Sequence, residues 1–332
     1  MPCTVIVGGF FGDEGKGKIV AYLAKKDKAD VAVRGGVGPN AGHTITFHGK
    51  EHKTRMLPSA LVSNQTRLMI GPGVLINVNV LLEEIKNFNT KDRTFVDPQC
   101  GIIDSTHIHE DASDSNLQRI GTTRTGTGPA NADRALRKGF LARDSVELSE
   151  YLQDIPRIVN SSIDRDETVL VEGTQGTFLS LYHGTYPFVT SKDVTASAIC
   201  SDVGIGPKKV SEVLVVFKAY VTRVGSGPLE GELEKEETTS KGWTEFGSVT
   251  GRLRRASPFN FELAKRSIML NSATQVALTK LDIVFPSDAG KTAFNKLSSD
   301  AKRFVNNIEK EIGKKVAVIG TGQELDDIID RR

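Results

Sequence analysis

A glycine-rich stretch near the N-terminus carries two acids and two lysines within the segment 12–18, which reads GDEGKGK. It follows the apolar run 4–7, typical of a buried strand, and precedes the run 19–24, typical of a helix. A turn between a strand and a helix directs backbone N–H groups and the positive helix end to one place, which suits a phosphate. Ile19 stands where a Walker-type loop has its Mg²⁺-binding Ser or Thr. Because Asp13 and Glu14 would repel a phosphate, these acids indicate an additional chemical role.

Four further segments are rich in Gly, Thr, Asn and Arg and follow predicted strands: 34–44, 121–137, 172–206 and 223–258. Long loops are usually functional, and open α/β sheets bind ligands at the carboxyl ends of their strands. We therefore expect these segments to form the walls of a site. His43 lies among glycines that allow a ligand to approach closely, which favours function over a purely structural role.

The tetrapeptide TKLD at 279–282 closes the apolar run 276–278. In many guanine-nucleotide proteins a similar N/T-K-x-D segment ends a strand, and its Asp accepts hydrogen bonds from N1–H and N2–H₂ of guanine. Adenine lacks this pair of donors, so the carboxylate would be left unpaired. Together with the phosphate-type turn and the strand and glycine turn at 316–322, Asp282 predicts GTP in preference to ATP.

The segment 247–255 contains three arginines, Arg252, Arg254 and Arg255. Such a run is usually a solvated face or a nucleic-acid patch. This run is short, isolated and preceded by a glycine-rich loop, which argues against nucleic acid. Arginine forks bind carboxylates and phosphates with two parallel hydrogen bonds. We expect a second substrate that carries carboxylates.

Taken together, these segments resemble the adenylosuccinate synthetase family, and they occur in the family's order from about residue 5 to about residue 322. The similar segments are GDEGKGK at 12–18, NAGHT at 40–44, IGTT at 120–123, EGTQGT at 172–177, HGTYP at 183–187, KAY at 218–220, TRVG at 222–225 and TKLD at 279–282. The resemblance implies ligation of IMP and L-aspartate to adenylosuccinate, with GTP hydrolysis and Mg²⁺, in the branch of purine nucleotide biosynthesis that leads to AMP. It also implies a homodimer.

The resemblance assigns two catalytic residues. Asp13 corresponds to the base that removes the N1 proton of IMP, so that the 6-oxygen can attack the γ-phosphate of GTP. Asp13 also corresponds to a Mg²⁺ ligand, together with the carbonyl of Gly42. His43 corresponds to the general acid. The residues implied for GTP are Gly12, Glu14, Gly15, Lys16, Gly17, Lys18, Thr44, Lys280, Asp282, Gly320 and Gly322.

The same correspondence assigns the other two substrates. The residues implied for IMP are Asn40, Thr123, Gln175 and Thr190, with Arg137 donated by the partner subunit to the neighbouring site. Those implied for L-aspartate are Thr250, Arg252 and Arg254. Two positions depart from the family pattern, because Val249 replaces a common Thr and Leu253 a common Arg. The chain is also shorter than the commonest members, with losses predicted between Arg143 and Glu172 and after Asp282.

The elements that position these residues alternate along the chain. Predicted strands cover 4–7, 30–34, 67–70, 101–103, 168–171, 213–220, 275–279 and 316–319, and predicted helices cover 80–88, 261–270 and 299–312. This pattern predicts an α/β fold: a large, mostly parallel central sheet flanked by helices, with a phosphate-loop-like GTP site. Without repeats or linkers, residues 1–332 are expected to form one domain.

The net charge, the cysteines and the apolar runs of the chain exclude some classes of protein. The chain has 332 residues, with 43 basic and 41 acidic side chains and a net charge of +2, so neither nucleic acid nor a membrane surface is an expected partner. Three scattered cysteines and the lack of a long apolar run indicate a cytoplasmic protein. Two alternatives remain. A GTPase switch would need a Ser or Thr after Lys18 and a D-x-x-G segment, and a regulatory nucleotide-binding protein would not need Asp13 or His43.

Overall fold

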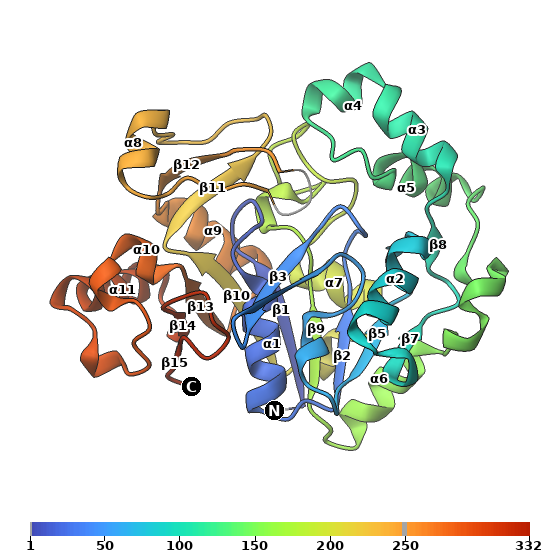
Figure 1. Ribbon diagram of the computed structural model, residues 1–332, viewed down its shortest axis with the longest axis horizontal. Coiled ribbons are helices and arrows are strands. Elements are labelled where there is room, and N and C mark those ends of the chain that lie inside the picture. The colour runs from blue at the N-terminus through green and yellow to red at the C-terminus, as the bar shows by residue number, and fades with distance from the viewer. Residues whose placement is uncertain (1, 248–250) are drawn as a thin grey trace.

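The computed structural model describes residues 2–247 and 251–332. Within these residues the central sheet has nine strands (Figure 1), in the order β15 (Ile328–Asp330), β14 (Val316–Gly320), β13 (Gln275–Thr279), β10 (Glu212–Lys218), β1 (Cys3–Gly8), β9 (Val169–Glu172), β2 (Val31–Arg34), β5 (Arg67–Ile70) and β7 (Thr94–Val96). All neighbours are parallel except β14 and β15. The predicted α/β fold class is confirmed.

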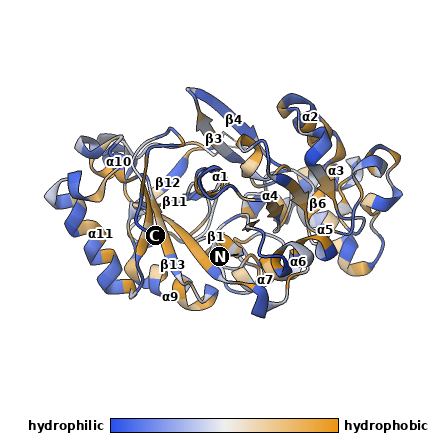
Figure 2. Ribbon diagram, turned by 90° about the horizontal axis from the view of Figure 1, so that it is seen from below, coloured by the Kyte–Doolittle hydropathy of each residue, from blue (hydrophilic) through white to orange (hydrophobic). Residues whose placement is uncertain are grey.

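Helices cover both faces of the sheet. One face packs against α1 (Lys16–Lys26), and the other against α6 (Ile155–Asp164), α7 (Ala196–Val203), α9 (Phe261–Asn271) and α11 (Ser299–Ile312). Successive side chains of a strand point to opposite faces of the sheet, so both faces of β1 are apolar. Val5 and Val7 belong to one core cluster, and Ile6 belongs to the other. Figure 2 shows the apolar strands between these helix layers.

The remaining elements lie outside the central sheet. They are the strand pairs β3 (His43–Phe47) with β4 (Lys50–Thr54), β6 (Leu75–Ile76) with β8 (Gly101–Ile102) and β11 (Tyr220–Val224) with β12 (Arg254–Pro258), and the helices α2 (Val78–Phe88), α3 (Ser105–Ser113), α4 (Ser115–Ile120), α5 (Thr127–Leu136), α8 (Lys235–Ser240) and α10 (Leu281–Val284). None of the helices in the described ranges is long and apolar enough to cross a membrane.

Several predicted elements need correction. The strand predicted at 213–220 is two strands, since β10 ends at Lys218 and β11 begins at Tyr220 in a different sheet. The strand predicted at 101–103 pairs with β6 outside the central sheet. The glycine-rich segments 121–137 and 172–206 contain α5 and α7, whose short lengths give weak periodic patterns. The helix at 299–312 is confirmed with both ends as predicted.

The parallel order brings distant loops together. The segments that follow β1, β2, β9, β10, β13 and β14 all leave the same edge of the sheet, because these strands run in one direction. The edge carries the phosphate-type loop, the histidine loop and the TKLD segment. Chain direction alone therefore places the predicted site walls side by side.

Candidate active site

A cleft of about 1250 Å³ lies over this edge. Most residues predicted for the site line it, and they come from segments more than 300 positions apart in the chain: Gly12, Asp13, Gly15, Lys16, Gly17, Lys18, Asn40, Gly42, His43, Thr44, Thr123, Gln175, Thr190, Arg252, Arg254, Lys280, Gly320 and Gly322. Three predicted residues, Glu14, Arg137 and Asp282, are not among its lining. Thr250, like Val249, lies outside the described residues.

The phosphate-type loop is shaped from within by Glu14. Its carboxylate accepts hydrogen bonds from the backbone N–H groups of Phe10 at 2.9 Å and Gly12 at 2.8 Å, and its side chain is 1% exposed. Positive φ angles at Gly12, Asp13 and Gly15 complete the turn before α1 begins. The Glu14 side chain is therefore directed into the loop and does not line the cleft, and its assignment to GTP stays a prediction. These hydrogen bonds also explain why an acid occurs there.

Both lysines of the loop are already partly engaged. The Lys16 ammonium lies 3.1 Å from Glu14 Oε2 and donates to the carbonyl of Gln175. The Lys18 ammonium donates to the carbonyls of Gly322 at 2.7 Å and Asp327 at 3.0 Å. Burial lowers the pKa of Lys18 to about 8. Since an ammonium has three donors, each lysine keeps one for a ligand.

His43 begins β3 and is held by a buried charged group. Its Nδ1 contacts the Glu172 carboxylate and lies 3.2 Å from Ser59 Oγ. Ser59 in turn donates to Glu172 from both its N–H and its hydroxyl, each at 2.6 Å. Burial lowers the pKa of His43, although Glu172 opposes this shift. Burial would raise the pKa of Glu172, but His43 and the Arg34 guanidinium outweigh it and hold the pKa below its ordinary value.

Sequence reasoning assigned no role to Arg34, Ser59 or Glu172. A signal was present, because Arg34 and Glu172 are charged residues that end otherwise apolar strands. In the sheet the two are direct register partners on β2 and β9. With Nδ1 directed at a carboxylate, the Nε2 atom of His43 is left for the cleft that the histidine lines.

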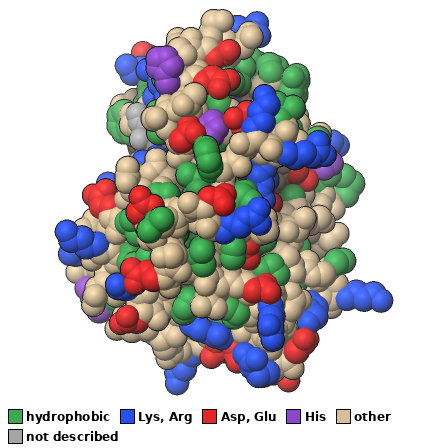
Figure 3. All heavy atoms as spheres, turned by 90° about the vertical axis from the view of Figure 1, so that its right-hand side faces the viewer, with side chains coloured by type: hydrophobic (Ala, Val, Ile, Leu, Met, Phe, Trp, Pro, Cys, Tyr) green, Lys and Arg blue, Asp and Glu red, His purple; other side chains and the backbone are tan. Residues whose placement is uncertain are grey.

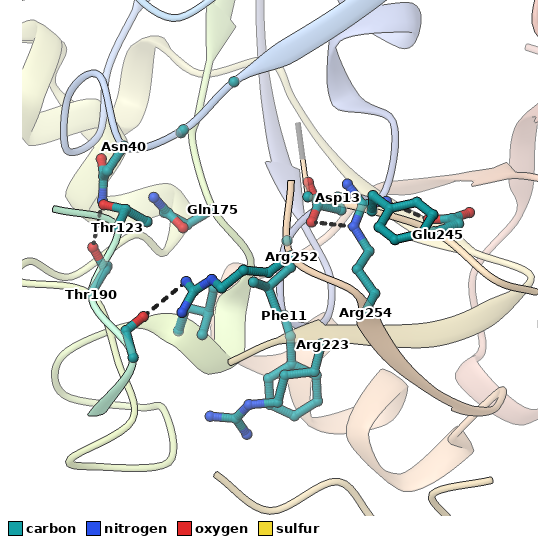
Figure 4. A pocket seen from close by; sticks show the side chains of 18 of the residues that line it. Phe11, Asp13, Asn40, Thr123, Gln175, Thr190, Arg223, Glu245, Arg252 and Arg254 are labelled. Carbon is teal, nitrogen blue, oxygen red and sulfur yellow. Dashed lines mark hydrogen bonds and ion pairs between the residues drawn. The ribbon is translucent and has the colours of Figure 1, made fainter. Parts of the chain in front are cut away.

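Polar side chains gather on one side of the cleft (Figure 4), where Asn40, Thr123, Gln175 and Thr190 lie together. Asn40 Nδ2 donates to Thr190 Oγ1 at 3.3 Å, which joins the histidine loop to the segment after β9. The Asn40 Oδ1 atom is buried and has no hydrogen-bond partner among the described residues. A buried unpaired acceptor indicates a place for a donor from a ligand.

Arg254 lies on the opposite side of Figure 4, beside Asp13 and Glu245, and Arg252 and Arg223 lie between the two sides. Arg254, the first residue of β12, forms an ion pair between its Nε and Asp13 Oδ2 at 2.9 Å. Arg252 Nη2 donates to the carbonyl of Gly121 at 2.9 Å. Phe11 stacks on the Arg223 guanidinium, with 4.5 Å from Cζ to the ring centre. The loop acid Asp13 is therefore directly connected to the arginine cluster.

The TKLD segment lies at the ends of β13 and β14. Thr279 Oγ1 donates to the carbonyl of Glu14 at 2.7 Å and so ties this segment to the phosphate-type loop. The Oδ1 atom of Asp282 is buried and unpaired within the part of the chain that is described. Burial raises the pKa of Asp282. A second buried acceptor without a donor thus lies beside the Lys280 end of the cleft.

Arg137 lies elsewhere. It caps the C-terminus of α5 with φ 63°, is exposed and does not line the cleft of its own chain. Its guanidinium has no partner among residues 2–247 and 251–332. The geometry therefore leaves this predicted residue apart from the others.

Comparison with known proteins decides the family. The family model described as adenylosuccinate synthetase matches residues 5–147 and 141–289. The chain belongs to the adenylosuccinate synthetase family. It is 53% identical to the adenylosuccinate synthetase of Methanocaldococcus jannaschii over all of this chain and 97% of that protein, and 49% identical to that of Pyrococcus horikoshii over all of this chain and 99% of that protein. These relatives share its length, so the adenylosuccinate synthetase is a short form like theirs.

Solved structures agree with this. The fully ligated adenylosuccinate synthetase of Plasmodium falciparum has a TM-score of 0.93 at 25% identity, with 99% of each chain covered. A cyanophage S-2L succinoaminodeoxyadenylate synthetase, bound to dGMP and to dATP as an energy donor, has a TM-score of 0.84 at 25% identity, with 99% of this chain and 95% of that chain covered. The protein is a GTP-dependent ligase of purine biosynthesis, which joins IMP and L-aspartate to form adenylosuccinate.

Proposed function

We propose that this adenylosuccinate synthetase uses Asp13 to activate IMP for phosphoryl transfer. The observation that carries the proposal is the position of the Asp13 carboxylate. It belongs to the phosphate-type loop, lines the cleft with a side chain that is 25% exposed, and pairs with Arg254, which the resemblance assigns to L-aspartate. A single group so placed can meet the purine, the nucleotide phosphates and the second substrate.

In the first step, Asp13 removes the proton from N1 of IMP, and the electron pair moves to the 6-oxygen. This oxygen attacks the γ-phosphorus of GTP, a bond to the 6-oxygen forms and GDP leaves. In the second step, the amino group of L-aspartate attacks C6, the bond from C6 to the 6-oxygen breaks, and inorganic phosphate leaves with this oxygen and with one proton from the amino group. Asn40, Thr123, Gln175 and Thr190 hold IMP, which the unpaired Asn40 acceptor supports.

His43 acts as the general acid beside the transferring phosphoryl group. Its ring is fixed by Glu172 at Nδ1, so Nε2 is the atom that faces the reaction. Burial favours the neutral ring in the free enzyme. The negative charge of bound phosphates acts in the opposite direction and favours the imidazolium that donates a proton. Lys16, Lys18 and the amides of the loop hold the phosphates, next to Thr44.

Mg²⁺ fits the oxygen atoms that line this part of the cleft. Asp13 offers one carboxylate and Gly42 one carbonyl, and no group of three or more acidic, His or Cys side chains that could hold a metal ion occurs in the described ranges. Such a sparse protein contribution is typical of Mg²⁺, which is usually held by one or two carboxylates and by substrate phosphates. When bound there, the ion supplies charge neutralisation during phosphoryl transfer.

Asp282 is the residue that selects guanine over adenine. Lys280 and the turn at Gly320 and Gly322 surround the guanine ring. The unpaired, buried Oδ1 atom of Asp282 supports this selection, since guanine offers it a donor and adenine does not. Arg252 and Arg254 bind the carboxylates of L-aspartate, together with Thr250. The cyanophage structure contains dATP as the energy donor, so the preference of this chain for GTP over ATP should be measured directly.

The reaction is tested by following adenylosuccinate spectrophotometrically with IMP, GTP, Mg²⁺ and L-aspartate. We expect product with GTP, and at least tenfold lower kcat/KM when ATP replaces GTP, about what one lost hydrogen bond to a charged group gives. Replacing IMP by dGMP, or L-aspartate by L-glutamate, serves as a control for the other subsites. Equal product with ATP would contradict the role of Asp282, and absence of product would contradict the whole proposal.

We also propose a homodimer in which Arg137 enters the neighbouring site. Arg137 is exposed and outside its own cleft, and two exposed apolar side chains flank it, Leu136 at 60% and Phe140 at 65%. Figure 3 shows the side of the molecule that carries α5, with hydrophobic side chains exposed among charged ones. Exposed apolar side chains beside an unpaired arginine are typical of an interface.

The dimer is tested with Arg137→Leu, which should raise KM for IMP about tenfold or more, as expected when one charged contact to a phosphate is lost. Mixing this variant with Asp13→Asn should restore part of the activity, because a hybrid dimer has one site with both native residues. Lys138→Leu, at the exposed neighbouring position, is the matched control. Unchanged IMP affinity, or no recovery in the mixture, would exclude the shared site.

Two wider properties complete the proposal. The whole chain works as one domain, since the central sheet includes strands from both ends of the sequence, β1 and β15. A cytoplasmic location is supported by the three buried free cysteines, which suit a reducing compartment.

A further inference from the structure

Glu245 lines the cleft at the centre of a cluster of charged side chains. Its carboxylate accepts from Lys218 Nζ at 2.9 Å and from the hydroxyl of Tyr220, and it contacts Nη1 of Arg254. The Lys280 ammonium lies 3.9 Å away. The Glu245 side chain is only 14% exposed, and that of Lys218 is 1% exposed. One carboxylate thus joins the ends of β10 and β13 to β11 and β12.

The backbone makes the same connection. Arg254 N–H donates to the carbonyl of Glu245 at 2.9 Å, Phe246 and Leu253 form a bridge, and the N–H of Gly247 donates to Arg252 at 2.8 Å. Residues 245–247 and 252–254 are therefore antiparallel, with Glu245 and Arg254 opposite each other. Main chain and side chain together fix where Arg254 enters the cleft.

The carboxylate of Glu245 neutralises the positive charges that surround it. Burial opposes ionisation of Glu245, but Lys218, Arg254 and Lys280 outweigh it and hold its pKa far below the ordinary value. Removing this one negative charge would leave three cations facing one another around a small, mostly buried space. The Arg254 guanidinium would then have only Asp13 as its carboxylate partner.

We propose that Glu245 is a positioning residue which divides the Arg254 guanidinium between itself and Asp13 and so keeps Arg254 at the L-aspartate side of the cleft. This inference rests on the proposed function of Arg254 as an L-aspartate ligand. Without Glu245, Arg254 shifts onto Asp13, which weakens L-aspartate binding and blocks the carboxylate that activates IMP. Glu245 itself lines the cleft beside Arg254, and its proposed effect on L-aspartate passes through the Arg254 guanidinium.

The neighbouring arginine provides a natural comparison. Arg255 pairs with Glu232 at 2.7 Å on the other side of β12, where the two side chains are 29% and 40% exposed. This pair does not line the cleft. Glu232→Gln is therefore a matched control that removes the same charge from the carboxylate partner of an adjacent arginine.

The test compares Glu245→Gln with Glu232→Gln in the complete enzyme. We expect Glu245→Gln to raise KM for L-aspartate about 10- to 100-fold, the range for losing a charged hydrogen-bond partner, and to lower kcat as well. KM for IMP should stay within about twofold, as for a site that keeps its contacts. Glu232→Gln should leave all three values near those of the wild type. An equal loss for every substrate would indicate a purely structural role and overturn the inference.

A double-mutant cycle separates this inference from the proposed function. If Arg254→Lys leaves KM for L-aspartate unchanged, the assignment of Arg254 fails. If Arg254→Lys raises KM but Glu245→Gln does not, or if the two effects are fully additive, the role of Glu245 fails. Glu245→Asp keeps the charge and should recover part of the affinity. If Glu245→Gln does not fold, Glu245→Asp is the deciding variant. A selective rise in KM for L-aspartate in Glu245→Asp supports the inference, and the lack of a selective rise overturns it.

Discussion

The two ends of the cleft are built in different ways. At the end proposed for guanine, Lys280 and the turn at 320–322 directly follow β13 and β14, which lie inside the central sheet. At the end proposed for L-aspartate, Arg254 begins β12, which pairs with β11 outside the central sheet, and Arg252 lies in the segment just before it. The first end is held by pairing within the central sheet, whereas the second adds ion pairs of Arg254 with Asp13 and Glu245 to the backbone pairing of its hairpin.

This difference has a functional consequence. Substitutions at the guanine end should remove a contact with GTP and leave neighbouring side chains in place, because the strands hold them. Substitutions at the aspartate end should shift arginines from one carboxylate to another. Asp13 connects the phosphate-type loop to Arg254, since it follows β1 in that loop and pairs with the Arg254 guanidinium.

The largest effect is expected for Asp13→Asn, which keeps the shape of the side chain and removes both the base and the partner of Arg254. We expect kcat to fall by about 10²- to 10⁴-fold, the usual contribution of a placed base. GTP and IMP should still bind in the absence of turnover, as measured by calorimetry. Asp27→Asn, an exposed acid at the far end of α1, is the control. A variant with near-normal kcat would remove Asp13 from this role.

A smaller effect is expected for Asp282→Asn at the guanine end. KM for GTP should rise about 10- to 100-fold, because a charged acceptor for two donors is replaced by a neutral amide. XTP should become the better donor, since the amide can donate to the 2-oxygen of xanthine. KM for L-aspartate should not change if the two ends are independent. Coupled changes at both ends would break the proposed contrast.

Local patterns were sufficient to predict much of this arrangement. The glycine turn at 12–18, the TKLD segment and the apolar strands each have a physical signature within a few residues. Parallel strands then bring their carboxyl ends to one edge, so residues far apart in the chain meet without any further signal. The positions of Asn40, Gln175 and Lys280 at one cleft follow from this rule.

Other features depend on which strands are neighbours. Arg34 and Glu172 are paired only because β2 lies beside β9, although the two strands are far apart in the chain. Glu14 reads as a ligand-facing acid until the turn directs its carboxylate at backbone N–H groups. Glu245 stands in a segment without periodic pattern, and its partners come from three other strands and the TKLD segment. No local pattern encodes such contacts.

Lys18 offers a pH-dependent test of the guanine end, because its ammonium holds the carbonyls of Gly322 and Asp327. Burial lowers its pKa to about 8, so the charge is lost as the pH rises above 8. KM for GTP should rise about fivefold between pH 7 and 9, equivalent to about 1 kcal/mol for one charge near a phosphate. Lys18→Met should have a high KM for GTP with little change over this pH range.

The same lowered pKa predicts an opposite trend for folding. Between pH 8 and about 10.5 the unfolded chain binds more protons at Lys18 than the folded chain. Stability therefore gains a contribution from Lys18 as the pH rises through this range, and Lys18→Met should lack it. Urea unfolding of both proteins at pH 8 and 10 measures the difference. A contribution of the opposite sign would mean that the ammonium is favoured by its carbonyl partners more than it is disfavoured by burial.

The smallest effect is expected for Leu253→Arg, which introduces the arginine that the family resemblance leads us to expect at this position. Leu253 is 43% exposed and does not line the cleft, whereas both of its neighbours do. Successive side chains of an extended segment point to opposite faces, so the substituted arginine should point to solvent. KM for L-aspartate should change by less than about twofold, as for an ordinary surface substitution. A fall of tenfold or more would place residue 253 inside the cleft, and the alternation that separates Arg252 and Arg254 from Leu253 would then be wrong.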